Sequence, residues 1–240
     1  MYYELTPENW AAQYIEAYWT YSNNTSKRIK AIIPPDGCTD IILSFNNGRC
    51  NQFVVGCMTR PAEVFIEPAE ISIGIRFRPC CASPFLNIPL IELTDKNIPL
   101  DEICELNIPA IDADCVSNKN FIFSAIENKL KKCFMEKQFD KIAYSAAVLI
   151  KDNNGLRTVD EIADIIGVSR RHLERKFMNS VGISPKFYSR ITRFQYVNKI
   201  LKVNIEDSLA SIAQNAGYYD QSHFYKEYKM LSGTVPLKKQ

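Results

Sequence analysis

Apolar and polar residues alternate in short segments along the first part of the chain. In EISIGIRFRP (70–79) every second residue from Ile71 to Phe77 is apolar, which places these side chains on one face of a strand. YIEAYWTYS (14–22) is rich in aromatic residues, and AIIPPDGCTDIILSFNNGRC (31–50) sets apolar runs around two turn signals. This pattern predicts a β-rich region, a sandwich or barrel, up to about residue 108.

The spacing of apolar residues then changes to three and four, which predicts helices. The segment 121–139 is amphipathic, and two interpretations of it are open: a helix that caps the β-rich region, or a helix that pairs with its copy in a dimer. DKIAYSAAVLIKDNNG (140–155) predicts a second helix, which Asn-Asn-Gly ends.

The C-terminal part contains one unit twice, in VDEIADIIGVSRRHLERKFMNSVGISP (159–185) and LASIAQNAGYYDQSHFYKEYKMLSGTVP (209–236). The first matched positions are 50 residues apart and the later ones 51, so one residue is inserted just after the glycine of the second copy. A repeat of this size predicts two similar supersecondary elements. The matched pairs are Ile162/Ile212, Ala163/Ala213, Gly167/Gly217, His172/His223, Leu173/Phe224, Phe177/Tyr228, Gly182/Gly233 and Pro185/Pro236.

Each copy has the signals of a helix, a tight turn and a second helix. In the first copy Thr158-x-x-Glu161 is a capping box, Gly167 can adopt the left-handed conformation that ends a helix, and Ser169 can cap the next one. This is the helix-turn-helix pattern, whose second helix lies in the major groove of DNA. We predict one such motif over 158–182 and another over 208–233.

A long helix is predicted between the two copies. Ser184 is a good N-cap, Pro185 suits the first helical position, and the helix runs to about Leu201. Such a helix is roughly 25 Å long, somewhat less than the ~34 Å between successive major grooves on one face of DNA. The shortfall predicts bent DNA or uneven insertion of the two second helices.

Helical geometry indicates which residues of each second helix face outward. With Leu173 toward the core, a rotation of about 100° per residue places Arg171 and Arg175 on the opposite side and Glu174 at their edge. With Phe224 toward the core, the outward residues of the second copy and its first turn are Gln221, Ser222, His223, Lys226 and Lys229. Arginine pairs with guanine and glutamine with adenine, so both helices carry residues suited to reading base edges.

Charge separates the two parts of the chain. The net charge is +2 overall, but residues 1–140 carry −5 and residues 141–240 carry +7. The basic part therefore points toward nucleic acid or an anionic surface. A membrane-surface role needs a broad exposed apolar helix face, which the C-terminal helices lack.

The composition is that of a folded soluble protein, with 46% hydrophobic and 23% charged residues. MYYELTPENW is polar rather than a secretion signal, and no apolar run approaches the ~20 residues of a membrane span. We therefore expect a cytoplasmic protein.

GVSRRHLERKFMNSVGISPKFYSRITRF and SIAQNAGYYDQSHFYKEYKMLSGTVP resemble the two helix-turn-helix halves of AraC/XylS-type transcription regulators. The resemblance covers about residues 141–240, and the run Asp220-Gln221-Ser222-His223-Phe224 is its most specific part. Departures are Lys226 where arginine is common, Tyr228 for phenylalanine and Val197 where alanine is usual. The resemblance implies a sequence-specific regulator of transcription that binds double-stranded DNA.

The resemblance also implies roles for individual residues. Expected base contacts are Arg171, Glu174, Arg175, Gln221, Ser222, His223 and Lys226. Expected phosphate contacts, which position the protein without specifying sequence, are Arg170, Lys176, Lys186, Arg190 and Lys229. Two roles are open for Glu174, which could accept from a cytosine or orient Arg171 and Arg175. RNA polymerase is a further partner that the resemblance allows.

The N-terminal part resembles a small β-rich domain found in some of these regulators, through PPDGCTDIILSF, VVG (54–56) and IGIRFRPCCASPFL. The resemblance implies a cupin-like barrel that senses a small-molecule effector, forms a homodimer, or both. A candidate effector pocket is lined by Trp19, Phe45, Phe65 and Phe77, with Arg76 or Arg78 for an anion. Strand alternation places these arginines on the face opposite the apolar residues from Ile71 to Phe77. We favour a position exposed on the outside of the domain, and contact of this face with the basic part is the alternative.

The alternative function is a metal- or thiol-dependent sensor or enzyme with an accessory basic helical module. Metal sites in such barrels need several histidines, and the chain has only His172 and His223, both in the basic part. The eight cysteines all precede residue 134 and contain no C-x-x-C pair, which favours buried thiols, and the adjacent Cys80 and Cys81 are the best candidates for a sensor. We therefore expect no enzymatic activity, no metal and no cofactor.

These observations predict an α+β chain in three parts. Residues 1–108 form the β-rich sensory domain, 109–139 a linker with the amphipathic helix, and 140–240 an all-α domain in which a long helix joins the two helix-turn-helix motifs.

Overall fold

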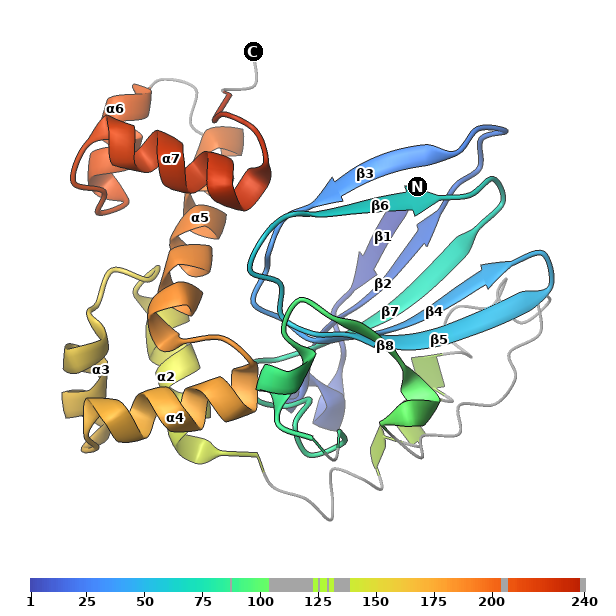
Figure 1. Ribbon diagram of the computed structural model, residues 1–240, viewed down its shortest axis with the longest axis horizontal. Helices are drawn as coiled ribbons and strands as arrows, with labels where there is room; N and C mark the ends of the chain where they lie inside the picture. The colour runs from blue at the N-terminus through green and yellow to red at the C-terminus, as the bar shows by residue number, and fades with distance from the viewer. Residues whose placement is uncertain are drawn as a thin grey trace.

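An antiparallel six-stranded sheet, in the order β1-β2-β7-β4-β5-β8, forms the centre of the N-terminal part of this computed structural model (Figure 1). The structure describes residues 1–86, 88–103, 123–124, 126–128, 130–131, 139–203 and 207–237. The strands of the sheet are β1 (Tyr2–Leu5), β2 (Ile15–Ser22), β4 (Asp40–Asn46), β5 (Arg49–Val55), β7 (Ile71–Phe77) and β8 (Asn97–Pro99). A separate two-stranded antiparallel sheet is formed by β3 (Ile29–Ile33) and β6 (Ala62–Ile66).

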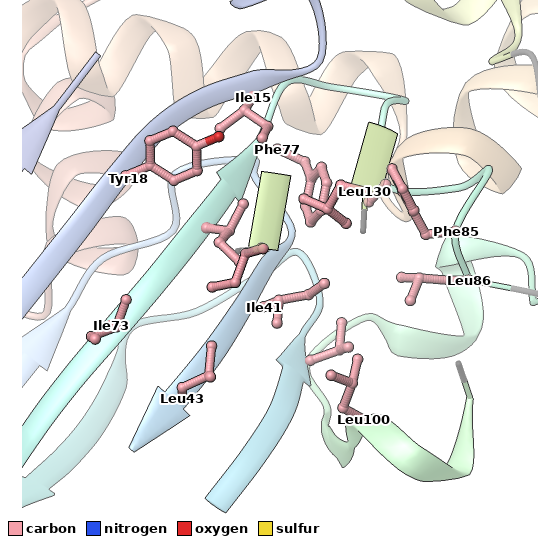
Figure 2. Close-up of a cluster of buried hydrophobic side chains, with 14 of the residues drawn as sticks. Ile15, Tyr18, Ile41, Leu43, Ile73, Phe77, Phe85, Leu86, Leu100 and Leu130 are labelled. Carbon is pink, nitrogen blue, oxygen red and sulfur yellow. The ribbon is translucent and has the colours of Figure 1, made fainter. Parts of the chain in front are cut away.

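One face of the six-stranded sheet carries the core of the N-terminal part. The register pairs Ile41 with Ile75 and Leu43 with Ile73, and all four side chains are fully buried on that face (Figure 2). The core exists because every second residue on these adjacent strands is apolar, so the apolar side chains of neighbouring strands meet on one side. The predicted strands and the tight turn before β5 are confirmed, with Asn47 at a φ of 49°.

The described part of the predicted amphipathic segment packs on this core. The described residues between 123 and 131 are helical, and Ile126 and Leu130 are fully buried among the sheet's apolar side chains. Phe123 stacks on Tyr18, whose hydroxyl donates to Glu127 at 2.6 Å. These contacts support the capping interpretation for these residues. The other residues of 109–139 that belong to this prediction lie outside the described residues, except for Phe139.

The C-terminal part consists of helices, so the prediction of a β-rich region followed by an all-α region is confirmed. Two helix-turn-helix pairs lie at opposite ends of a 19-residue helix, α5 (Figure 1). The helix is roughly 28 Å long, two residues longer than the sequence suggests. The helices are α2 (Lys141–Asp152), α3 (Val159–Ile166), α4 (Arg170–Val181), α5 (Pro185–Val203), α6 (Leu209–Asn215) and α7 (Gln221–Ser232), with 3-10 turns η1 (Asn9–Gln13), η2 (Leu90–Leu93) and η3 (Leu100–Glu102).

The predicted helix signals operate as expected. Thr158 and Glu161 form both bonds of the capping box at the start of α3, and Gly167 ends that helix in the left-handed conformation, with a φ of 78°. The side chains of Ser169 and Asp220 cap α4 and α7. We call α3 with α4 the first module and α6 with α7 the second module.

The N-terminal part packs against α5. The ring of Tyr188 lies against Gly37 in the loop between β3 and β4, and Gln195 donates to the backbone carbonyl of Asp36 at 3.0 Å. Lys151 on α2 forms an ion pair of 2.6 Å with Glu16 on β2. The contacts of Tyr188 and Gln195 hold the β3–β4 loop against α5, and the ion pair holds β2 against α2.

The N-terminal part also contacts the C-terminal ends of α4 and α7 at equivalent positions of the repeat. Gly182, which ends α4, accepts a hydrogen bond from the side chain of Thr94, just after η2. Gly233, which ends α7, lies beside Ile32 on β3 and Pro61 just before β6. Figure 1 shows the opposite ends of both helices pointing away from the sheets.

A matched pair of glycine substitutions separates the contribution of this contact from that of backbone conformation. A Cβ at Gly182, whose φ is +96°, would lie 2.8 Å from the carbonyl oxygen of Leu90, whereas a Cβ at Gly167, whose φ is +78°, would meet nothing within 4 Å. We expect Gly167→Ala to lower the free energy of unfolding by about 1 kcal/mol through the left-handed conformation alone. Gly182→Ala adds the displacement of η2 and should cost about 2–3 kcal/mol. Urea unfolding measures both, and equal losses would show that η2 does not press on α4.

Candidate nucleic-acid interface

The first turns of α4 present its basic residues to solvent. Ser169 caps the helix by accepting from the backbone of His172, while Leu173 and Phe177 are fully buried against α2 and α3. Arg171 and Arg175 are exposed on the other side of the helix. The structure thus places the two arginines opposite the core, as the helical angles predict.

The charged residues of α4 also interact with neighbouring side chains. Arg170 bonds Glu174 at 2.9 Å and Asp160 on α3 at 2.8 Å. In this structure Glu174 therefore pairs with Arg170. Arg175 instead contacts the Nδ1 atom of His172 at 3.2 Å. These exposed pairs are screened by solvent and contribute little to stability, so their members remain able to exchange partners.

Lys176 and Lys186 lie in different surroundings. Lys176 is 2.8 Å from Asp140, the residue that caps α2 through the backbone of Ile142 and Ala143, so this pair ties α2 to α4. Burial alone would raise the pKa of Asp140, but the bonds from Lys176 and the helix backbone lower it below its ordinary value. Lys186 is exposed in the first turn of α5.

The second module repeats this arrangement with less charge. Asp220 caps α7 by accepting from the backbone of His223 at 2.7 Å, and Phe224 and Leu231 are fully buried. α7 has two lysines, whereas α4 has three arginines and a lysine. The residues proposed from sequence that are exposed here are Gln221, Ser222, His223, Lys226 and Lys229.

Arg190 differs from the other predicted phosphate contacts because its guanidinium is bound inside the protein. Its Nε atom lies 2.6 Å from Glu227 on α7, whose side chain is only 4% exposed, and its guanidinium also lies over the ring of Phe187. This ion pair joins α7 to α5. The sequence did not reveal it, because Arg190 and Glu227 are 37 positions apart and each looks like an ordinary surface charge.

The structure does not bring the four residues of the candidate effector pocket together. Phe45 and Phe77 are buried in the core of the sheet. Trp19 lies over Gly74 outside that core cluster and donates to Asp40 at 2.8 Å. Phe65 is 49% exposed on β6 of the two-stranded sheet. These side chains do not line one cavity, because strand alternation places Trp19 on the opposite face of the sheet from Phe45 and Phe77, and Phe65 belongs to the other sheet.

The sequence favours an exposed position for Arg76 on the outside of the sheet, but the structure places its side chain in a partly buried cluster. Its guanidinium lies 2.9 Å from Asp36 and 3.2 Å from Asp40, and its side chain is 23% exposed. Because Asp36 also receives the bond from Gln195, this polar cluster supports the interpretation that the face meets the basic part. Arg78 donates to the backbone carbonyl of Ala12. Burial raises the pKa of Asp40 to about 6, against the lowering effect of Arg76.

Four of the five described cysteines have the environment of buried thiols, and Cys50 is partly buried. Cys38, Cys57, Cys80 and Cys81 are buried, and burial raises the pKa of each thiol above its ordinary value. A raised pKa disfavours the reactive thiolate, which argues against Cys80 and Cys81 as a redox sensor. Within the described ranges no group of three or more histidine, cysteine or acidic residues could hold a metal ion.

Two family models match the chain. Residues 162–239 match a helix-turn-helix domain, and residues 3–99 match a domain of unknown function (DUF6597). The chain is 35% identical over 81 residues to a probable thc operon regulatory protein of Rhodococcus erythropolis, and 28% identical over 71 residues to a lactose operon transcription activator of Staphylococcus xylosus. These matches cover 33% and 30% of this chain but only 24% and 25% of the relatives, so the chain spans about a quarter of the length of the curated relatives it matches.

Among solved structures, an AraC-type regulator from Chromobacterium violaceum is 28% identical, with 40% of this chain and 85% of that one covered and a TM-score of 0.37. ToxT from Vibrio cholerae is 14% identical, with 91% and 96% covered and a TM-score of 0.47.

Two modules on one connecting helix define a double helix-turn-helix domain, and the family model identifies its residues as a helix-turn-helix domain. It follows the β-rich residues 3–99, which match DUF6597. In the described part of the chain no helix is long and apolar enough to cross a membrane.

The pKa of Asp40 predicts a specific pH dependence of stability. Its pKa of about 6 in the folded protein exceeds the ~3.9 of an unfolded aspartate, so the folded state binds the extra proton between these values. This contribution to stability is fully present below about pH 4 and is lost as the pH rises through 6. Asp40→Asn should remove it, on the order of 2 kcal/mol between pH 4 and 7. Unfolding followed by tryptophan fluorescence measures the change, since both tryptophans, Trp10 and Trp19, lie in the N-terminal part.

The Arg190–Glu227 pair predicts a rescue experiment. Glu227→Gln leaves a partly buried guanidinium without its carboxylate and should lower the free energy of unfolding by about 2 kcal/mol. The double variant Arg190→Met with Glu227→Leu replaces the pair by apolar side chains and should recover most of that loss. Thermal unfolding of the three proteins checks this expectation, and no difference between the single and double variants would contradict it.

Proposed function

We propose that the chain is a sequence-specific DNA-binding regulator of transcription that reads DNA with α4 and α7. The proposal rests on the pair of modules. The second helix of each module, α4 or α7, is capped at its N-terminus, and its exposed first turn points away from the sheets (Figure 1). The names of the relatives, an operon regulatory protein and a transcription activator, agree with this function.

Base contacts are assigned to the exposed first turns of the two reading helices. In the first module they are Arg171 and Arg175, with Glu174 at the edge, where it can accept from cytosine once Arg170 turns to a phosphate. In the second module they are Gln221, Ser222, His223 and Lys226. Arginine, glutamine and lysine at these positions can form the hydrogen bonds that distinguish base pairs in the major groove.

Phosphate contacts are assigned to Arg170, Lys176, Lys186 and Lys229. On binding, Arg170 exchanges the exposed carboxylate of Asp160 for a phosphate, and Lys176 exchanges the less exposed carboxylate of Asp140. Arg190 keeps Glu227 as its partner and acts by positioning α7.

The spacing of the modules predicts how the DNA is engaged. A helix of roughly 28 Å falls short of the ~34 Å between successive major grooves, so both reading helices enter only if the DNA bends or one inserts less deeply. Because the N-terminal part touches the end of each reading helix, it holds the modules in this arrangement.

The N-terminal part, residues 1–108, is proposed to sense an effector, to form a homodimer, or both, and 140–240 to be the DNA-binding domain. The supporting contact is the β3–β4 loop, which joins the Arg76 cluster to α5 through Asp36 and Gln195. RNA polymerase is a further proposed partner, and the cytoplasm the proposed location. The proposal involves no enzymatic reaction.

Substitutions in the reading helices test the assignment. Once a binding site is recovered by genome-wide capture of bound DNA, Arg171→Ala and Arg175→Ala should each cost about 1–3 kcal/mol and relax preference at particular base pairs. Lys229→Ala should weaken binding to all sequences about equally and reduce the salt dependence of log K by about one. A mobility-shift titration in which Arg171→Ala leaves both affinity and base preference unchanged would overturn the assigned reading face.

A further inference from the structure

The turn of the second module is one residue longer than the turn of the first. Gly167 and Gly217 both adopt the left-handed conformation, with φ of 78° and 73°. Between this glycine and the N-cap of the reading helix the first module has only Val168, whereas the second has Tyr218 and Tyr219. The extra residue therefore lies directly before Asp220, the N-cap of α7.

The two tyrosines have opposite environments. Tyr218 takes the place of Val168: it is 5% exposed, and its ring packs edge-on against Phe224 at 5.2 Å and His223 at 5.5 Å. Tyr219 is 94% exposed, more than any other large apolar or aromatic side chain in the described part of the chain. Tyr218 holds the turn in place, and Tyr219 projects from it.

The position of Tyr219 relates it to the reading surface. It precedes Asp220, which caps α7, and is next to the exposed Gln221 and Ser222 at the start of that helix. A tyrosine held in solvent forgoes the burial that a large side chain usually gains. A rigid aromatic group at the entrance of a reading helix is suited to contact the DNA that this helix approaches.

We propose that Tyr219 is a DNA-backbone contact, with its hydroxyl donating to a phosphate oxygen and its ring packing on the adjacent deoxyribose. The inference rests on the proposed function and adds a contact of the second module that has no counterpart in the first. Tyrosine hydroxyls are among the groups that bind phosphate, and such contacts position the protein without reading sequence. A neutral contact of this kind offsets the smaller charge of α7, which has two basic residues where α4 has four.

The test uses the full chain with Tyr219→Phe, Tyr219→Ala and, as a matched control, Tyr3→Ala, an exposed tyrosine on β1. Tyr219→Phe should raise Kd about threefold and Tyr219→Ala about tenfold, on the captured site and on a scrambled duplex alike. The slope of log K against log salt should stay unchanged, because a tyrosine releases no counterion, whereas Lys229→Ala lowers it by about one. Tyr3→Ala should bind as the unmodified protein does, and thermal unfolding should show all variants folded.

Each outcome bears on one proposal or the other. If the unmodified protein binds its site and Tyr219→Ala binds equally well, the role of Tyr219 is refuted and the proposed function stands. A loss confined to one base pair would make Tyr219 a base contact and overturn the backbone role. If the unmodified protein binds no duplex DNA at all, the proposed function itself fails.

Discussion

The seating of the β3–β4 loop on α5 is the contact on which the arrangement of the whole chain depends. Tyr188 packs against both Gly37 and Phe177 of the first module, so one buried ring joins the β3–β4 loop to α4. Gly37 has a φ of +75° and leaves no room for a Cβ beside this ring, which makes the approach possible only for glycine. Because interiors are close-packed, a displacement of this loop is transmitted to α5 rather than absorbed.

The two modules have the same helical arrangement but are stabilised by different ion pairs. In the first, Arg170 forms exposed ion pairs with Asp160 and Glu174, whereas in the second Arg190 pairs with the buried carboxylate of Glu227. Exposed pairs are weak and exchangeable, but a buried carboxylate requires its partner. The first module can therefore rearrange its charged side chains, whereas the second keeps its helix in one orientation.

Local signals predicted the elements well, because capping boxes, left-handed glycines and apolar spacing act within a few residues. Thr158, Gly167 and Ser169 each do what their residue type favours, and strand alternation correctly separated the faces of β7. What the sequence did not show depends on residues distant along the chain: the partner of Arg190, the Asp36–Arg76 cluster and the dispersal of the four aromatic residues. The insertion before Asp220 was visible in the repeat, but only the structure separates the buried Tyr218 from the exposed Tyr219.

The continuity of α5 constrains how this architecture can evolve. Each residue of an α-helix advances the chain by about 1.5 Å and turns it by about 100°, so a single insertion or deletion in Pro185–Val203 would rotate the second module about the helix axis relative to the first. A change of about seven residues, close to two full turns, nearly restores the orientation, but it would shift the module by roughly 10 Å. Substitutions in α4 and α7 can therefore change the exposed side chains of each module, while the length of α5 keeps the distance between the modules constant.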